Sequence, residues 1–203
     1  MTNGVEEDKA SQNSKIDLID ESDRGCVIVA ASLIDDHLKS LLIREASFHR
    51  NRKKFTKGLF ESNGPLATFS GKASICRAFG LIDDVIYNDI TILRKLRNRF
   101  AHAADHVDFA DASVLKEVFR MDCCTKIAAE WTAPRVQLDP DVRPLPEYEI
   151  RTRGFVKYGK SIFCLGVRML QIAMQEHEIA RRAPIVALAK SLGLGEVSGP
   201  EPA

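Results

Sequence analysis

Residues 97–102 (RNRFAH) are the part of this sequence whose side chains could carry out a reaction. Arg97 carries a fixed positive charge that can hold and neutralise a phosphate, and the imidazole of His102 titrates near neutrality, where it can act as a general acid or base. Together they suffice for metal-independent cleavage of RNA, in which the substrate's 2′-hydroxyl is the nucleophile. Asn98 would orient either group. Arg97, Asn98 and His102 are therefore candidate catalytic residues if the protein is a nuclease.

The helix predicted over residues 83–101 puts Arg97 in an unexpected place. At about 100° per residue, Arg97 lies about 20° from Ile86, inside the apolar stripe of that helix. Leaving one member of a buried ion pair without its partner costs about 3–5 kcal/mol. Arg97 must therefore meet a carboxylate, face a cleft or contact another subunit.

A structural reading competes with the catalytic one. In it, Arg97 belongs to an ion pair and His102 is an exposed residue at the helix end that interacts with the helix dipole. On a continued helix His102 would lie about 160° from Ile86, so the two residues share a site only if the helix ends or two subunits meet there. Residues of the first helix could form structural ion pairs; they are Arg24, Asp35 and Asp36.

The composition fits a globular protein with a substantial core. Hydrophobic residues make up 45% of the 203 positions, charged residues 28%, and the net charge is +1. This balance gives no global attraction to nucleic acid or to a membrane. The nearly apolar runs at 26–34 and 162–174 are shorter than the roughly 20 residues that a membrane-spanning helix needs. With no secretory signal pattern and an odd number of cysteines, five, we expect a cytoplasmic protein with reduced thiols.

The hydrophobic pattern predicts an all-α fold, a single-domain bundle of about five main helices. They are expected at about 24–46, 66–79, 83–101, 112–131 and 155–182. Pro65 suits the start of the second helix, Gly80 suits its left-handed end, and Asp83 suits the start of the third. The first helix has an amphipathic stripe made of Val27, Ala30, Ala31, Ile34, Leu38, Leu41 and Leu42.

Three segments fall outside this pattern. Residues 1–21 are acidic and polar and are predicted to be a disordered tail. Residues 132–151 contain four prolines and are predicted to be an extended connecting loop, which is long for a compact domain. Pro184 is expected to end the last helix, so that the domain covers 22–183 and a flexible tail covers 184–203.

Several stretches in the first half of the chain resemble the mannitol operon repressor (MltR-type) family. They are residues 21–26 (ESDRGC), 28–38 (IVAASLIDDHL), 64–72 (GPLATFSGK), 80–82 (GLI) and 93–102 (LRKLRNRFAH). The resemblance implies a helical, oligomeric transcriptional regulator without a recognisable DNA-binding domain. It therefore implies a homodimer or higher oligomer and a protein partner.

The spacing of Arg97 and His102, with four residues between them, also resembles the motif of HEPN domains. These are helical dimers, many of them ribonucleases, in which motif residues of two subunits meet in one cleft. This resemblance implies a HEPN-like fold and carries a possible role over to Arg97, Asn98 and His102. Many HEPN-type domains only bind or scaffold, so the resemblance does not decide between catalysis and binding.

Other residues could contact nucleic acid. Arg94, Arg99 and Lys72 could guide RNA towards Arg97, and the basic run at 50–57 offers Arg52, Lys53 and Lys54. Residues 75–86 have the spacing of a helix-turn-helix, but Asp83 and Asp84 would point carboxylates at DNA phosphates. Residues 102–108 hold two histidines and two aspartates without further metal-ligand spacing, so we expect no metal and no other cofactor.

Two functions follow from the sequence. The first is a helical regulator that acts in transcriptional control through protein contacts, with Arg97 structural. The second is a metal-independent endoribonuclease in which His102 is the acid–base catalyst and Arg97 clamps the scissile phosphate. The family resemblance is far longer than the short motif, so it favours the regulator.

Overall fold

A computed structural model describes residues 18–45, 57–61, 63–103, 106–132 and 147–192. All regular secondary structure in these ranges is helical, which confirms the all-α prediction. The helices are α1 (Asp23–Glu45), α3 (Phe69–Ala78), α4 (Asp84–His102), α5 (Ala112–Val118), α6 (Asp122–Thr132) and α7 (Glu147–Ser191). Within the described ranges, no helix is long and apolar enough to cross a bilayer.

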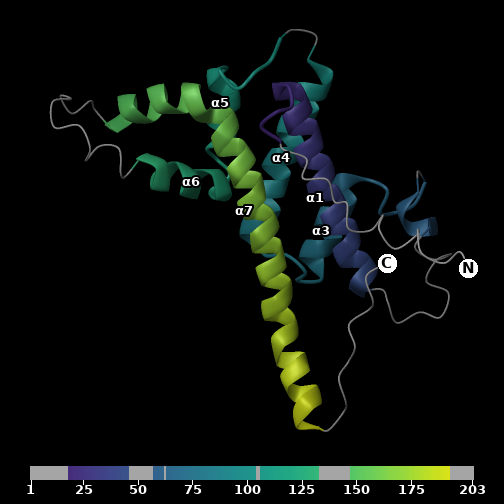
Figure 1. The fold of residues 1–203 in the computed structure, drawn as a ribbon. Helices are drawn as coiled ribbons and strands as arrows, with labels where there is room; N and C mark the ends of the chain where they lie inside the picture. Colours follow the sequence, from purple (N-terminus) through teal and green to yellow (C-terminus); the bar gives the residue numbers. More distant parts are fainter. Residues whose placement is uncertain (1–17, 46–56, 62, 104–105, 133–146, 193–203) are drawn as a thin grey trace, which may run out of the picture.

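The helices form two groups joined by one long helix (Figure 1). In the first group α1 packs against both α3 and α4, and α3 also packs against α4. In the second group α5 and α6 lie against α7. Helix α7 also contacts α1 and α4, and its C-terminal part extends beyond the other helices (Figure 1). One continuous apolar core therefore underlies both groups.

Three phenylalanine rings link the two groups at the centre of this core. The ring of Phe109 lies 5.7 Å from that of Phe100 on α4 and 5.2 Å from that of Phe163 on α7, measured between centroids. Phe100 and Phe163 are fully buried. Tilted pairs at these distances add to the energy of apolar burial.

The apolar stripe predicted for the first helix is confirmed in α1. All of its members are buried: Val27, Ala30, Ala31, Ile34, Leu38, Leu41 and Leu42. Leu18, which we placed in the N-terminal tail, is also buried against the core. Ordered packing therefore begins before residue 22, while residues 1–17 lie outside the described part.

The turn between α3 and α4 follows the predicted signals. Gly80 has φ +63°, and its N–H donates to the Arg77 carbonyl at 3.0 Å, while the Leu81 N–H donates to Cys76 at 2.8 Å. This pair of bonds is the Schellman motif, which needs a residue in the left-handed region. Asp83 then caps α4 by accepting from the Ile86 N–H at 2.8 Å. Glycine and aspartate thus fix the angle between the two helices.

Helix α3 begins later than predicted. Its cap is Thr68, whose hydroxyl accepts from the Gly71 N–H at 3.0 Å, and Pro65 lies outside the helix. Threonine is a favoured cap because its side-chain oxygen satisfies an amide at the helix start that would otherwise lack a partner. The local cap therefore prevails over the proline signal.

The single helix predicted over 112–131 is wrong, because two helices, α5 and α6, occupy that stretch. Asp89 of α4 is 3% exposed and accepts from the amides of Asp122 and Cys123 at 2.7 and 3.0 Å. A buried carboxylate on the first amides of a helix fixes its start. The capping group comes from another helix, so no local signal marks the break.

Helix α7 is longer at both ends than the predicted 155–182. It begins at Glu147, within the segment that we predicted to be a loop, and it continues through Pro184 to Ser191. Residues 133–146 of the predicted loop lie outside the described ranges. Pro184 is exposed, so water can satisfy the carbonyl that loses its helical partner.

Helices α6 and α7 approach closely because α7 carries a glycine at their crossing. A Cβ added to Gly166 would lie 2.4 Å from the Cys124 sulfur and 3.2 Å from the Cys124 Cα. Real Cβ atoms do not come this close, so the crossing requires a residue without a side chain. Gly166 therefore determines how tightly the second group of helices packs.

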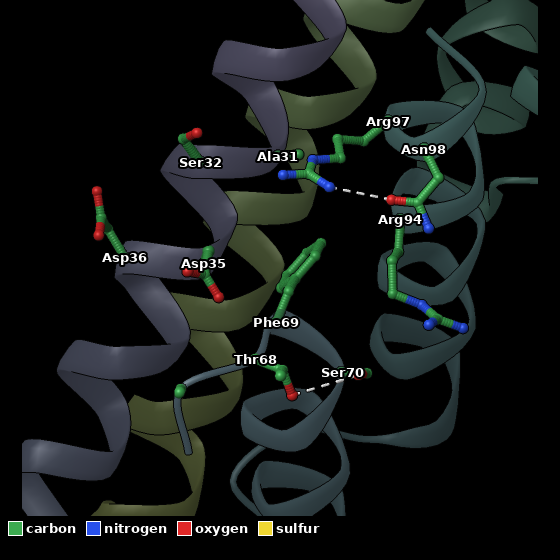
Figure 2. Close-up of a pocket in the computed structure, with 11 residues that line it drawn as sticks. Ala31, Ser32, Asp35, Asp36, Thr68, Phe69, Ser70, Arg94, Arg97 and Asn98 are labelled. Carbon is green, nitrogen blue, oxygen red and sulfur yellow. Dashed lines mark hydrogen bonds between the residues drawn. The ribbon is translucent and has the colours of Figure 1, made fainter. Parts of the chain in front are cut away.

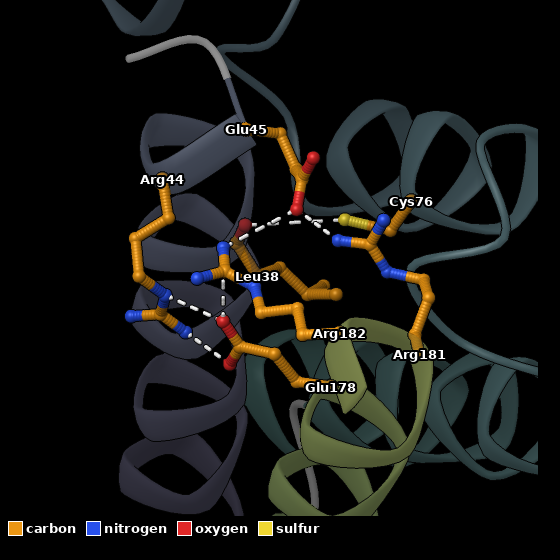
Figure 3. Close-up of polar contacts among 7 residues, drawn as sticks. All are labelled: Leu38, Arg44, Glu45, Cys76, Glu178, Arg181 and Arg182. Carbon is orange, nitrogen blue, oxygen red and sulfur yellow. Dashed lines mark hydrogen bonds and ion pairs between the residues drawn. The ribbon is translucent and has the colours of Figure 1, made fainter. Parts of the chain in front are cut away.

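An ion-pair network joins the C-terminal end of α1 to α7 (Figure 3). Arg44 donates to both carboxylate oxygens of Glu178, at 2.8 and 2.6 Å. Glu45 accepts from Arg181 and, at 3.3 Å, from Arg182. Bidentate arginine–carboxylate pairs fix orientation as well as adding energy. The network holds α7 alongside α1 beyond the apolar core.

The five cysteines are free, as predicted, and four of them are buried. Burial raises the pKa of the Cys76 thiol to about 12. A hydrogen bond with Cys164, reinforced by burial, raises the pKa of Cys26 above its ordinary range, and the two sulfurs are 3.5 Å apart. These thiols therefore stay protonated and serve as small apolar core groups.

Candidate functional site

A polar cleft lies where α1, the start of α3 and the C-terminal half of α4 meet (Figure 2). It encloses about 610 Å³. Its lining residues come from the three helices and from the two residues before α3; they are Ala31, Ser32, Asp35, Asp36, Ala67, Thr68, Phe69, Ser70, Arg94, Arg97 and Asn98. Most of these side chains carry hydrogen-bonding or charged groups, so the cleft suits a polar ligand.

One wall of the polar cleft is formed by α4. Arg97 is exposed, and its Nη1 donates to Oδ1 of Asn98 at 3.1 Å. Its guanidinium reaches from α4 towards α1 in Figure 2. Of the three environments expected for Arg97, the structure therefore gives the cleft, where its side chain is exposed. The apolar stripe of α4 opens at this level because the cleft separates α4 from α1.

Arg94 lies one turn before Arg97 on the same wall. Over the part of the chain that the structure describes, Arg94 forms no hydrogen bond or ion pair, and Arg97 forms no ion pair with a carboxylate. Two guanidinium groups with unused donors therefore line the cleft. Each can present a planar, bidentate face to an oxyanion.

The opposite wall belongs to α1 and carries two carboxylates, Asp35 and Asp36. Lys72 of α3 is 4% exposed and places its Nζ 3.0 Å from Oδ1 of Asp35. The same Nζ lies 3.4 and 3.5 Å from the carbonyl oxygens of Leu66 and Ala67. Lys72 thus fixes the start of α3 against α1 and gives the cleft a rigid base.

The expected ion pairs therefore have different members. Asp35 pairs with Lys72 rather than with Arg97, and Asp36 has no ion pair within the described ranges. Arg24 donates to the carbonyl of Ala103 at 3.0 Å, which ties α1 to the end of α4. Arg24 is thus a structural residue, although its partner is a carbonyl rather than a carboxylate.

His102 does not belong to the polar cleft. Helix α4 continues to His102, and this histidine is exposed and absent from the lining of the cleft. On a continuous helix Arg97 and His102 point about 140° apart. A single chain therefore brings Arg97 and Asn98 together but leaves His102 on another side of α4.

The candidate nucleic-acid residues fall into three groups. Lys72 is buried and Arg99 donates to Asp111 and Ser113, at 2.6 Å in both cases, so both already serve the fold. Arg94 remains available in the cleft. The other three lie outside the described residues; they are Arg52, Lys53 and Lys54.

The structure also decides where the residues of the possible helix-turn-helix and of the possible metal site lie. The apolar residues predicted for α4 are all buried, so α4 is a core helix and cannot enter a DNA groove; they are Ile86, Ile90, Leu93, Leu96 and Phe100. His106 lies 3.3 Å from Asp108. Among the residues that the structure describes, no group of three or more potential metal ligands occurs.

A second surface, absent from the sequence candidates, follows one side of α7. We name it the α7 stripe; its members are exposed apolar residues, Leu165 (39%), Met169 (42%), Ile172 (40%), Ile179 (69%) and Val186 (47%). Spacings of three, four and seven residues put them on one face of the helix. Exposed apolar side chains gathered on one face of a helix indicate an interaction site.

A groove runs beside the α7 stripe, between α7 and the starts of α4 and α6. It encloses about 500 Å³ and includes Val85, Met169 and Ile172, all substantially exposed. Acidic side chains surround it: Asp83, Asp122 and Glu176. In the sequence, residues 162–174 are apolar on more than one side of the helix, and this pattern is the signal that could have indicated this surface.

Comparison with known proteins gives a family and a fold. A family model described as mannitol repressor, MtlR, matches residues 18–174. A chain in the X-ray structure of the MtlR–HPr complex from Escherichia coli has 20% sequence identity and a TM-score of 0.54, over 76% of this chain and 90% of that chain. At this identity the likeness shows a shared fold, and no curated protein matches. The family model covers well over half of the sequence, and the chain therefore belongs to the mannitol repressor family.

Proposed function

We propose that this protein is a regulator in transcriptional control that acts through protein contacts, and that it binds an HPr-type protein on the α7 stripe. The family description supports the regulatory role. The similar structure is a complex of MtlR with HPr, which supports this class of partner. The cytoplasm is the expected place of action.

The α7 stripe is the observation that carries this proposal. Its residues have the same apolar chemistry as the core, yet the fold leaves them 39–69% exposed. Protein interfaces combine an apolar centre with a polar rim, and the groove beside the stripe has this arrangement. A stripe along one helix can be covered by a partner without rearrangement of the bundle.

The rim indicates the chemistry of the partner. Asp83 and Glu176 form no ion pair within the described residues, while Asp122 pairs with Lys126 at 2.6 Å. The rim is therefore acidic on balance. A partner with an apolar patch flanked by basic side chains is complementary to it, and this complementarity favours rapid association.

The test is a calorimetric titration of the full chain with purified HPr from the same organism. The double change Met169→Glu and Ile172→Glu should weaken binding at least tenfold, because it places charge in the centre of the interface. Ile19→Glu is the matched control, since Ile19 is 40% exposed, like Ile172, but lies outside the stripe. Wild-type affinity in the stripe variant, or no binding by the wild type, would overturn the proposal.

Self-association, which the family resemblance implied, is checked in the same series. Size-exclusion chromatography with light scattering gives the mass of each variant in solution. If the wild type is a dimer that the stripe variant converts to a monomer, a second copy rather than HPr covers the stripe. If the mass is unchanged by the variant, any oligomer uses another face.

A metal-independent endoribonuclease is the second candidate function. The exposed guanidinium of Arg97, beside Asn98 on the polar cleft, favours it. His102 would have to come from a second subunit, because it faces away from Arg97 within one chain. The protein is incubated with labelled single-stranded RNA and tRNA without divalent metal. Cleavage lost separately in folded His102→Ala and Arg97→Ala variants would support this function, and no cleavage would remove it.

A further inference from the structure

We propose that the polar cleft binds a small phosphorylated polyol, with its phosphate on the α4 wall and its hydroxyl groups towards α1 and α3. This inference goes beyond the proposed function, which concerns a partner on the α7 stripe. It assigns a ligand class to a cleft in which Arg94, Arg97 and Asp36 have no ion-pair partner among the residues that the structure describes.

The phosphate site follows from Arg94 and Arg97. They are three residues apart on α4, so their side chains are neighbours on the helix surface. Over the described ranges neither forms an ion pair, although Asp35 and Asp36 line the same cleft. Each guanidinium on this wall therefore keeps a positive charge and unused donors, which an oxyanion in the cleft can accept. A phosphate matches both the charge and the fork geometry.

The start of α3 adds to this preference for an anion. Thr68 and Ser70 lie at the floor of the cleft in Figure 2, at the positive end of the helix dipole. The ion pair between Lys72 and Asp35 holds this end in place. With Asp35 matched by Lys72, the cleft retains two arginines against the single carboxylate of Asp36.

The α1 wall limits how large the anion can be. Asp36 has no cation partner in the described part, and its carboxylate lines the same cleft as the arginines. A nucleic-acid strand would bring successive phosphates past this wall and be repelled. A single phosphate held on the α4 side avoids the repulsion.

The remaining lining groups suit hydroxyl groups. Ser32, Thr68, Ser70 and Asn98 can both donate and accept hydrogen bonds, and the carboxylate of Asp36 accepts them. The ring of Phe69 offers apolar surface for a carbon chain. A volume of about 610 Å³ falls in the range of small-molecule sites. A polyol with one phosphate therefore satisfies both walls.

The experiment titrates the full chain with mannitol 1-phosphate, a six-carbon polyol monophosphate, by calorimetry at fixed ionic strength. Mannitol and inorganic phosphate are titrated separately. We expect the phosphate ester to bind at least tenfold more tightly than either fragment, because each wall of the cleft recognises one part of it. Equal binding of the ester and inorganic phosphate would overturn the polyol part, and equal binding of mannitol would overturn the phosphate part.

Matched variants locate the site. Arg94→Gln and Arg97→Gln should each weaken binding of the ester at least tenfold. Asp36→Asn should weaken binding of the ester more than binding of inorganic phosphate. Lys95→Gln is the control, since Lys95 is an exposed cation of α4 outside the cleft. An equal loss in Lys95→Gln, or none in the arginine variants, would overturn the assignment. Titration of the same variants with HPr shows whether the proposed function fails independently.

Discussion

The polar cleft and the α7 stripe are two surfaces that could each bind a ligand, but the groups they offer differ in chemistry. In the cleft, Arg94 and Arg97 line a concavity and have no carboxylate partner among the described residues. On the stripe, apolar groups such as Ile179 stand on a helix whose end extends beyond the bundle (Figure 1). A concave polar site suits a small ligand, and an extended apolar face suits a protein. The molecule therefore separates two kinds of recognition.

Helix α4 connects the two regions. Its C-terminal half forms a wall of the polar cleft, and its first turn, with Val85 and Ile86, borders the groove beside the α7 stripe. Asp89, between these two parts of α4, fixes the start of α6, and Phe100, near the end of α4, contacts the ring of Phe109. Substitutions along α4 should thus affect one region at a time, unless they reach the core that both share.

The largest effect is expected from two aspartates that differ in burial. Asp89→Ala removes the acceptor of two amides at the start of α6 and should lower the free energy of unfolding by about 3 kcal/mol. Asp36→Ala, in the polar cleft, should change it by less than about 0.5 kcal/mol. Chemical denaturation followed by circular dichroism measures both. Equal losses in the free energy of unfolding would contradict the view that Asp89 supports the fold while Asp36 does not.

A somewhat smaller loss is expected at the helix crossing that supports the α7 stripe. Gly166→Ala would put a methyl group against Cys124 and should cost about 2 kcal/mol, because the contact includes backbone as well as sulfur. Gly58→Ala is the matched control, since nothing lies within 4 Å of its added Cβ. Thermal unfolding of both variants gives the comparison. Wild-type stability in Gly166→Ala would show that α6 and α7 can separate freely.

Titrating a variant of each region with both ligands tests whether the two regions bind independently. Arg94→Gln should weaken mannitol 1-phosphate at least tenfold, about 1.4 kcal/mol, and leave HPr binding unchanged. Ile172→Glu should weaken binding of HPr and leave the affinity for the phosphate ester unchanged. Calorimetry on each variant with each ligand gives four affinities. A loss of both ligands in either variant would show that the regions are coupled through α4 or α7.

Local patterns predicted much of the fold. The stripe of α1, the left-handed glycine at residue 80 and the cap at Asp83 are short-range features, and all three are confirmed. The break between α5 and α6 could not be found in this way, because its cause, Asp89, is 33 residues before Asp122. Yet Asp89 lies about 300° from Ile86 on the wheel, beside the apolar residues of α4. The helical-wheel argument that placed the charged Arg97 in the apolar stripe therefore also marks Asp89 as a charged residue near that stripe.

The candidate site was predicted in part. From the sequence we predicted functional roles for Arg97, Asn98 and Arg94, and ion pairs for Asp35 and Asp36. All five residues line one cleft. Three environments were open for Arg97, and the sequence could not select the cleft because a helical wheel gives the direction of a side chain but not where the neighbouring helix moves away. Lys72 was misjudged for a related reason. Its burial depends on Asp35 and two carbonyl groups that only the packed helices bring together.

The smallest predicted effect is a dependence of stability on pH at the α1–α7 network. Burial lowers the pKa of His37 below its ordinary 6.5, the nearby charge of Arg44 lowers it further, and Glu178 opposes them. The folded state therefore binds the His37 proton more weakly than the unfolded chain does. His37 costs no stability above pH 6.5, and it reduces stability as the pH falls through that value towards the lower folded pKa.

His37→Gln should therefore reduce the loss of Tm between about pH 7.5 and pH 5.5, because glutamine takes up no proton in either state. Thermal unfolding at a series of pH values measures the slope for each variant. His102→Gln, which removes an exposed imidazole far along α4, is the matched control. If His102→Gln flattens the profile and His37→Gln does not, acid sensitivity arises at the C-terminal end of α4 rather than where α1 and α7 are joined.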